Sequence, residues 1–361
     1  MKMMNDKFNT RAISLLTEAL LKTEALFNAN KANWFADFTA HFQKTCIQIR
    51  QCQSEASLPA ITYLDYSMLY TNFIIRRYVA EIFVYNDNSY LDKSQRLIGE
   101  YDVSFMFVHF DKLWERLLDE KKRYAGKVKA WEITAFMIEA LPSFFSYLAN
   151  VARFAIKGYP DAIPLDEINK NNVFRVNIGG YMSKPENVYT AKKNKDAKVL
   201  VKWFGERLEN AYTFDDYSEL DFSGQSFKLT DFRYSQFRFS LLNDVNLKDC
   251  ALIGVNFHKA YMSNCCLESC SIYEADFSNA ILRNVSFVNA HGRAGLPDEN
   301  EWRHVGFLPV NFRNADLTGA NFTGANLSGA DFTGADLTNA DFTDATLDNA
   351  IFDNCRGLNL G

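Results

Sequence analysis

Cysteine and histidine are the residue types in this chain most able to carry chemistry. The seven cysteines stand at positions 46, 52, 250, 265, 266, 270 and 355, and their spacing matches neither a zinc-ligand pattern nor a disulfide framework. We therefore expect reduced thiols, as in a cytoplasmic protein. The five histidines are scattered, and no Ser-His-Asp order, paired-carboxylate motif or Gly-rich phosphate loop accompanies them. The residues predict a protein that is not an enzyme and needs no cofactor or metal.

The densest group of residue types that could bind a partner lies between residues 288 and 306, in the segment VNAHGRAGLPDENEWRHVG. The candidate binding residues there are His291, Arg293, Asp298, Glu299, Glu301, Trp302, Arg303 and His304. An exposed Trp beside Arg is a typical anchor of a binding interface. In the alternative interpretation, Trp302 folds back to cover the repeat structure around the segment, and the rest of the segment is a tolerated insertion. We expect no metal site at the two histidines, because no further ligand pattern accompanies them.

A repeat of five residues surrounds this segment. From Asn311 the chain reads NFRNA DLTGA NFTGA NLSGA DFTGA DLTNA DFTDA TLDNA IF, with Phe or Leu at every fifth position and a small residue, mostly Ala, two residues before it. The spacing continues backwards in degraded form to Tyr212 with a single interruption. A period of five fits neither an α-helix nor a plain strand. The interruption predicts a loop that leaves the repeat near residue 290 and returns near 306.

The A-(D/N)-(L/F)-x-x pattern resembles the pentapeptide-repeat family, and the resemblance covers about two-fifths of the chain. It implies a right-handed quadrilateral β-helix, a non-catalytic rod in which four pentapeptides make one turn and the large and small residues point inward. Residues 20 apart then stack, so we expect Phe312, Phe332 and Phe352 to form one ladder. Such ladders would account for the 31 Phe residues. Cys250, Cys265 and Cys270 fall on small inward positions and are expected to pack as small hydrophobic residues.

The rod is expected to be acidic. Residues 211–361 hold 10 Lys and Arg against 20 Asp and Glu, which argues against direct binding of nucleic acid, because phosphate contacts need Lys and Arg. The acidic rod surface is predicted at Asp316, Asp331, Asp336, Asp341, Asp344, Asp348 and Asp353. The negative charge of this surface is compatible with a basic protein partner. A homodimer through the C-terminal end of the rod is a further possibility.

The N-terminal part is predicted to be all-α. Amphipathic and apolar patterns predict a helical bundle over residues 1–157, with helices at about 5–29, 31–55, 62–85, 103–125 and 128–157. Residues 158–210 are interpreted as a mixed connector followed by a helix, at about 196–210, that caps the first turn of the rod. The rod itself is placed at residues 211–356. The sequence therefore predicts a two-domain α+β protein.

Two functions follow as expectations. The first is a non-enzymatic scaffold that presents the acidic rod to a protein partner. The second comes from the family resemblance: some members are similar to B-DNA in width and charge, bind type II topoisomerases (DNA gyrase or topoisomerase IV) and protect them from drugs or toxins. We expect no membrane partner, because the apolar window Ile133–Ala152 is interpreted as a buried core helix.

Overall fold

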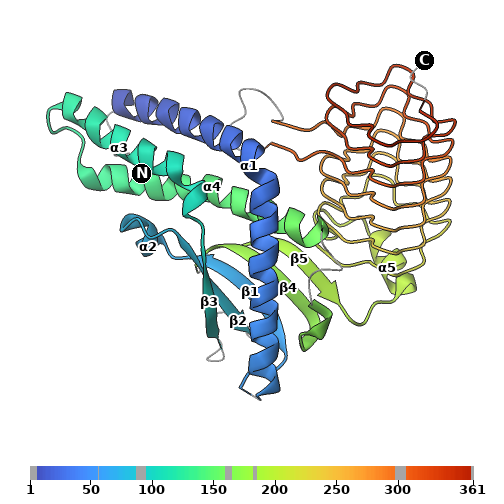
Figure 1. Cartoon of the computed structure of the whole chain (residues 1–361), viewed down its shortest axis with the longest axis horizontal. Coiled ribbons are helices and arrows are strands. Elements are labelled where there is room, and N and C mark those ends of the chain that lie inside the picture. The colour runs from blue at the N-terminus through green and yellow to red at the C-terminus, as the bar shows by residue number, and fades with distance from the viewer. Residues whose placement is uncertain are drawn as a thin grey trace. The chain divides into compact units, whose positions relative to one another are not determined.

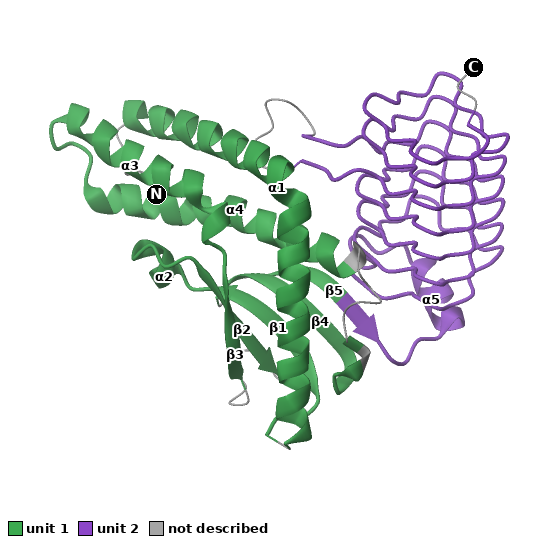
Figure 2. Ribbon diagram, in the orientation of Figure 1, with its two compact units in different colours: residues 1–189, 298–305 green, residues 190–297, 306–361 purple. Residues whose placement is uncertain are grey.

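The computed structural model describes residues 6–55, 57–86, 95–158, 165–181, 185–296 and 306–358. The chain divides into two compact units (Figure 2). The first comprises residues 1–189, and the second comprises residues 190–297 and 306–361.

The first unit combines long helices with a sheet (Figure 1). Its elements are α1 Asp6–Ser54, β1 Ile61–Met68, α2 Tyr70–Ile74, β2 Val79–Tyr85, β3 Arg96–Asp102, α3 Val108–Lys121, α4 Ala130–Gly158, β4 Lys170–Gly180 and β5 Glu186–Lys192. Short 3-10 helices lie at Ser104–Met106, Lys122–Tyr124 and Leu165–Glu167. The last three residues of β5 already belong to the second unit.

The five strands form one sheet in the order β3-β2-β1-β4-β5. The central strand β1 pairs antiparallel with β2 and parallel with β4, and β2 pairs antiparallel with β3. A parallel pair needs a long crossover, and the chain between β1 and β4 supplies it with α3 and α4. Helix α1 packs against β3 and helix α4 against β4, so the helices cover the sheet.

The helical part of the first unit is confirmed, but the prediction that residues 1–157 are all-α is wrong. The helix expected at 62–85 consists instead of β1, the short helix α2 and β2. This segment is apolar on nearly all sides, so its periodicity cannot separate a buried helix from a buried strand. Its many β-branched and aromatic residues favour strands. The expected connector 158–210 likewise holds β4 and β5.

Helix α1 is continuous where two helices were expected. The helices expected at about 5–29 and 31–55 are one helix, and Asn side chains near residue 30 bond back onto it. The Asn28 Nδ2 donates to Glu24 Oε1 at 2.9 Å, and the Asn30 Nδ2 donates to the Leu26 carbonyl at 2.9 Å. These bonds let the helix run on to Ser54.

Helix α4 is long and apolar enough, over Ala130–Ile156, to cross a membrane by composition alone. In the structure 61% of its most apolar window is buried within the protein. Phe144, Leu148 and Ala152 are fully buried there. This burial is what a core helix requires.

The second unit contains a coil in which residues 20 apart form parallel bridges, such as Gln236 with Asn256 and Asp331 with Ile351. Bridged positions recur every five residues, so four of them complete one turn. Each turn hydrogen-bonds to the next through the backbone; for example, the Phe322 amide donates to the Asp341 carbonyl at 2.7 Å. Pentapeptide spacing therefore places equivalent residues in columns along the coil.

The expected ladder of Phe rings is confirmed. Ring centroids of Phe277, Phe312, Phe332 and Phe352 follow one another at 5.1, 4.9 and 5.0 Å, with ring planes within 9° of parallel. Small inward residues, such as Ala315 and Ala335, are buried beside them. Stacked rings thus fill the core of the coil.

Most corners of the coil have a residue with positive φ, at the second position after the core residue. Asn and Gly occupy most corners in the C-terminal half, as at Asn314 (φ 55°) and Gly334 (φ 73°). These residues tolerate the left-handed region best. The preference for Gly and Asn in the repeat is therefore a backbone requirement.

Helix α5, Ala197–Phe204, covers the first turn of the coil, in the region where the sequence predicted a capping helix. Its first turn is capped by Asp196, whose Oδ1 accepts from the Lys198 amide at 2.8 Å. The Phe204 ring is buried among core rings, 5.0 Å from Tyr217 and 5.1 Å from Phe232. The helix thereby closes the apolar core at this end.

Candidate functional site: the surface of the rod

The aspartates of the repeat have a structural reason for their position. Asp316, Asp331, Asp336 and Asp341 each stand directly before a core residue and accept a hydrogen bond from the amide of the residue two positions later. Asp336 Oδ1 accepts from the Thr338 amide at 3.1 Å and its hydroxyl at 2.7 Å, and Asp341 Oδ1 accepts from Thr343 at 2.9 and 2.7 Å. Asn321 makes the same two bonds with Thr323. These Asx turns hold the side chains in fixed orientations.

Two of the seven predicted surface aspartates form ion pairs. Arg283 Nε lies 2.6 Å from Asp316 Oδ2, and Arg313 Nη1 lies 3.0 Å from Asp331 Oδ2. Asp336 stands in the same column as Asp316, bridged to it one turn further on. The charge of the acidic surface is therefore carried mainly by its last turns.

Hydrogen bonding lowers the pKa of two of these carboxyl groups. The hydroxyl and backbone N–H of Thr343 lower the pKa of Asp341. For Asp316, burial acts to raise the pKa, but bonds from Thr318 and Arg283 outweigh it and the pKa is lowered. Both groups are thus held in the charged form.

The remaining aspartates lie in the last turns and are exposed. Asp344 occupies a corner with φ of 56°, and Asp348 and Asp353 follow in the next two pentapeptides. The structure therefore places all seven predicted residues on the outside of one coil, distributed around it rather than gathered at a single point.

The interruption of the repeat begins later than predicted. His291 still bridges Ser271 and Asn326, and the Ala294 amide donates to the Ser328 carbonyl at 2.8 Å. The excursion starts after Gly295, which forms an antiparallel bridge with Phe307. Beyond it the ladder resumes with Asp276 paired to Asn311, an offset of 35 residues instead of 20.

Gly292 occupies a core position of the repeat and is buried. A Cβ at Gly292 would lie 2.7 Å from Val310 Cγ2 and 2.9 Å from Ile272 Cγ1. The two neighbouring side chains already fill the core space at this position, so the coil needs no large residue there.

Of the predicted binding residues in this segment, the structure describes two, His291, which is exposed, and Arg293. The other six lie outside the described residues: Asp298, Glu299, Glu301, Trp302, Arg303 and His304. Their role in binding stays a prediction.

The cysteines of the rod serve packing. The Sγ atoms of Cys250, Cys265 and Cys270 donate to main-chain carbonyls 23 residues earlier, at 2.9, 2.7 and 2.9 Å. Burial raises the pKa of Cys250 and of Cys265 to about 12, which disfavours the reactive thiolate. Within the described ranges, no group of three or more His, Cys, Asp or Glu residues could hold a metal ion.

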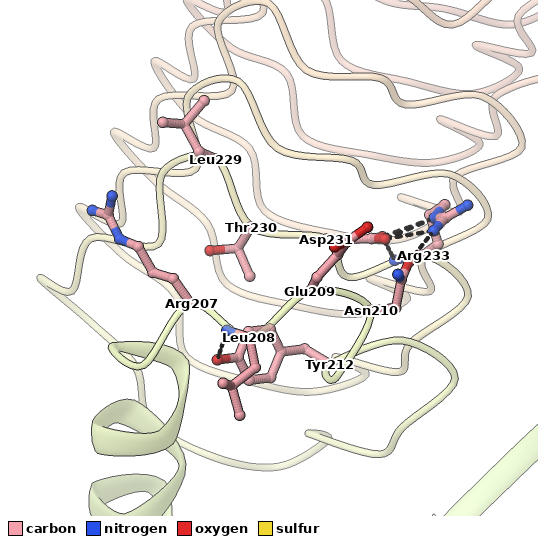
Figure 3. Close-up of a pocket in the computed structure, with 9 residues that line it drawn as sticks. All are labelled: Arg207, Leu208, Glu209, Asn210, Tyr212, Leu229, Thr230, Asp231 and Arg233. Carbon is pink, nitrogen blue, oxygen red and sulfur yellow. Dashed lines mark hydrogen bonds and ion pairs between the residues drawn. The ribbon is translucent and has the colours of Figure 1, made fainter.

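A hollow of about 400 Å³ lies beside the first turns of the coil, and the sequence did not predict it. Figure 3 shows its lining residues, which are Arg207, Leu208, Glu209, Asn210, Tyr212, Leu229, Thr230, Asp231 and Arg233. Most of its polar groups bond to one another. Arg233 donates to Asp231 and Asn210, and the Tyr212 hydroxyl accepts from the Leu208 amide at 2.9 Å.

Bulky side chains at several corners were also missed. Phe239 and Leu229 occupy left-handed corners, with φ of 58° and 59°, and both are exposed. Their signal was present in the sequence, because both stand where later repeats carry Gly or Asn.

Comparison with known proteins identifies pentapeptide repeats in the coil. The family model of pentapeptide repeats matches residues 230–268, 310–344 and 320–356, in eight copies. No curated protein sequence matches the chain.

Solved structures similar to the chain are also repeat proteins. HetL of Nostoc sp. strain PCC 7120, a pentapeptide repeat protein involved in heterocyst differentiation regulation, is 14% identical, with a TM-score of 0.18, over 44% of this chain and 95% of its own. A pentapeptide repeat protein from the Arabidopsis thaliana thylakoid lumen is 24% identical, with a TM-score of 0.19, over 35% and 71%. QnrB1, a plasmid-mediated fluoroquinolone resistance protein, is 18% identical, with a TM-score of 0.18, over 41% and 82%.

Proposed function

The C-terminal part of this chain belongs to the pentapeptide-repeat family, and we propose that the protein is a non-enzymatic scaffold whose rod binds a basic protein partner in the cytoplasm. In this proposal the coil is a right-handed quadrilateral β-helix. The observation that carries it is the ordered array of carboxylates on the last turns, exemplified by Asp336 and Asp341 with their bonds to Thr338 and Thr343.

Such an array suits recognition better than catalysis. The carboxylates are oriented before a partner arrives, so binding does not need to order them. Their repeated spacing presents negative charge along a rigid surface, which attracts and aligns a positively charged partner. The exposed Asp344, Asp348 and Asp353 extend this surface to the last described turn.

The proposal is tested with the double variant Asp336→Asn, Asp341→Asn in the full chain. Asn keeps the turn bond, as Asn321 does, so the coil should stay folded while two charges are lost. We expect basic proteins that wild type retains at low salt to be retained much less by the variant, measured by affinity capture and mass spectrometry.

The matched control is Asp221→Asn, Asp244→Asn, which removes two charges from the first turns. Asp221 makes the same turn bond, accepting from the Ser223 amide at 2.9 Å. Unchanged retention by the double variant, or equal loss in the control, would contradict the proposal.

A type II topoisomerase is the second candidate partner. The charge of the last turns favours it: residues 306–358 contain seven Asp against two Arg, and the repeat resembles a family with members similar to DNA. We expect full-length protein to inhibit supercoiling by DNA gyrase, or to protect it from a quinolone, and we expect deletion of residues 296–306 to weaken the effect. No effect at micromolar protein would exclude gyrase.

The homodimer through the C-terminal end stays a prediction from the sequence.

A further inference from the structure

Some corners of the coil carry Gly or Asn, and others carry a residue of another type, such as Phe239. In the column that contains residue 239, the corner is Glu219 one turn earlier and Lys259 one turn later, and it is Asn279, Asn314 and Gly334 in the turns after that, all with positive φ. Phe239 adopts the same backbone, with φ of 58°. Bulky residues rarely occupy this region, so Phe239 is not the residue that the coil itself favours. Such a departure points to a role outside folding.

The Phe239 ring is not compensated by burial in the core. Its side chain is 38% exposed. Two cations flank the ring: the Arg238 guanidinium carbon lies 5.3 Å from the ring centroid, and Lys259 Nζ lies 5.5 Å away. These contacts hold both positive charges beside an exposed aromatic surface.

The next side of the coil continues the apolar surface. Leu241, two residues after Phe239, is 40% exposed, and Tyr261 is 46% exposed. The two are bridged, so they stand side by side in adjacent turns, and Ile281 follows in the same column. In later turns this column carries Asp316 and Asp336 instead. We name Arg238, Phe239, Leu241, Lys259 and Tyr261 the aromatic corner.

The charge of the aromatic corner is opposite to that of the rod as a whole. Over residues 236–243 and 256–263, which form it, Arg238 and Lys259 are the only residues of the types Lys, Arg, Asp and Glu, and both are positive. Glu219 and Asp221 stand in the same two columns one turn earlier. Arg238 Nε is buried with no hydrogen-bond partner among the described residues.

We propose that the aromatic corner docks an acidic peptide segment with apolar side chains from a partner protein. The apolar side chains pack on Phe239, Leu241 and Tyr261, and the Asp or Glu carboxylates pair with Arg238 and Lys259. This deepens and rests on the proposed scaffold function, because it adds a second docking surface, of opposite charge preference, to the acidic last turns. Aromatic residues and Arg are the residue types that anchor interfaces most often.

Binding is measured by fluorescence anisotropy with the full-length protein and a labelled synthetic peptide in which Phe and Leu alternate with pairs of Glu. Two comparison peptides replace Glu by Lys, or Phe and Leu by Ser. We expect micromolar affinity for the first peptide and at least about tenfold weaker binding of the other two.

The decisive variant is Phe239→Asn, which installs the residue found at Asn279 and Asn314. We expect its melting temperature to stay the same or rise, and its affinity for the peptide to fall about tenfold. The matched control is Leu229→Asn. It makes the same kind of change at a corner that is 70% exposed and lies outside the aromatic corner, and it should leave affinity unchanged.

The proposal is overturned if the Lys peptide binds as well as the Glu peptide, or if Phe239→Asn keeps full affinity. Asp336→Asn, Asp341→Asn leaves the aromatic corner intact and should bind the peptide as wild type does. The capture experiment can therefore contradict the proposed role of the acidic surface without affecting the peptide assay. The peptide assay can likewise contradict the role of the aromatic corner alone.

Discussion

At the scale of single residues, one hydrogen-bond arrangement serves both the fold and the surface. In the last turns, an Asp or Asn directly before a core residue accepts from the residue two positions later, as in Asp316 with Thr318 and Asn326 with Ser328. The bond needs only a side-chain oxygen, so Asp and Asn are equivalent for folding. They differ in charge, and this leaves the net charge of the rod free to serve recognition.

The ion pair of Asp316 with Arg283 links two turns across the interruption, and acid should weaken it. The pKa of Asp316 is lowered in the folded protein by Thr318 and Arg283 despite burial. The resulting stabilisation is present above the unfolded-state pKa, near the ordinary 3.8, and is lost as pH falls through the lower folded-state pKa. We expect Asp316→Asn to be less stable than wild type at pH 7, by at most about 1 kcal/mol for such an exposed pair.

We also expect the difference to shrink below pH 3.8, in thermal unfolding followed by circular dichroism. Asp353→Asn serves as the control, since no ion pair holds Asp353 among the described residues. A constant difference between Asp316→Asn and wild type across this range would contradict the linkage.

At the scale of elements, the capping helix α5 closes the apolar core at the first turn of the coil. The Phe204 ring contacts Tyr217, Phe227 and Phe232, and is 2% exposed. We expect Phe204→Ala to destabilise the first turns by about 3–5 kcal/mol, because it leaves a cavity among these rings. Hydrogen exchange of amides 212–237 should speed up, while that of amides 311–337 should not.

Val199→Ala on the same helix is the matched control, because Val199 is 64% exposed and its truncation should leave exchange unchanged. Uniform acceleration along the whole coil in Phe204→Ala would show that the turns open together and that the cap has no local effect.

The elements also differ in how far the sequence predicts them. The coil was predictable because its period of five differs from that of any helix or strand, and every turn repeats the same evidence. The sheet was not, because β1 is buried along almost its whole length and shows no alternation. Long-range pairing, such as β1 with β4, is set by packing that local patterns do not encode.

At the scale of the whole molecule, charge differs between the coil and the part of the chain that precedes it. Residues 1–210 carry 29 Lys and Arg against 24 Asp and Glu, whereas residues 211–361 carry 10 against 20. The acidic surface was predictable from this asymmetry and from the repeat. The aromatic corner was not, since only the φ of Phe239 and the exposure of Leu241 and Tyr261 identify it. Composition predicts the overall charge of a surface but not its local exceptions.

The bridge between Gly295 and Phe307 has a consequence for how this chain can change over evolution. The ladder resumes in phase after it. The hydrogen bonding of the turns on either side therefore does not depend on how many residues the excursion contains. Closing a loop twice as long costs only about 0.6 kcal/mol more. Lineages are therefore free to lengthen, shorten or replace this segment, whereas one residue added inside a pentapeptide would shift every later ring out of its ladder. Variation in recognition should accumulate at this junction, on a scaffold that hardly changes.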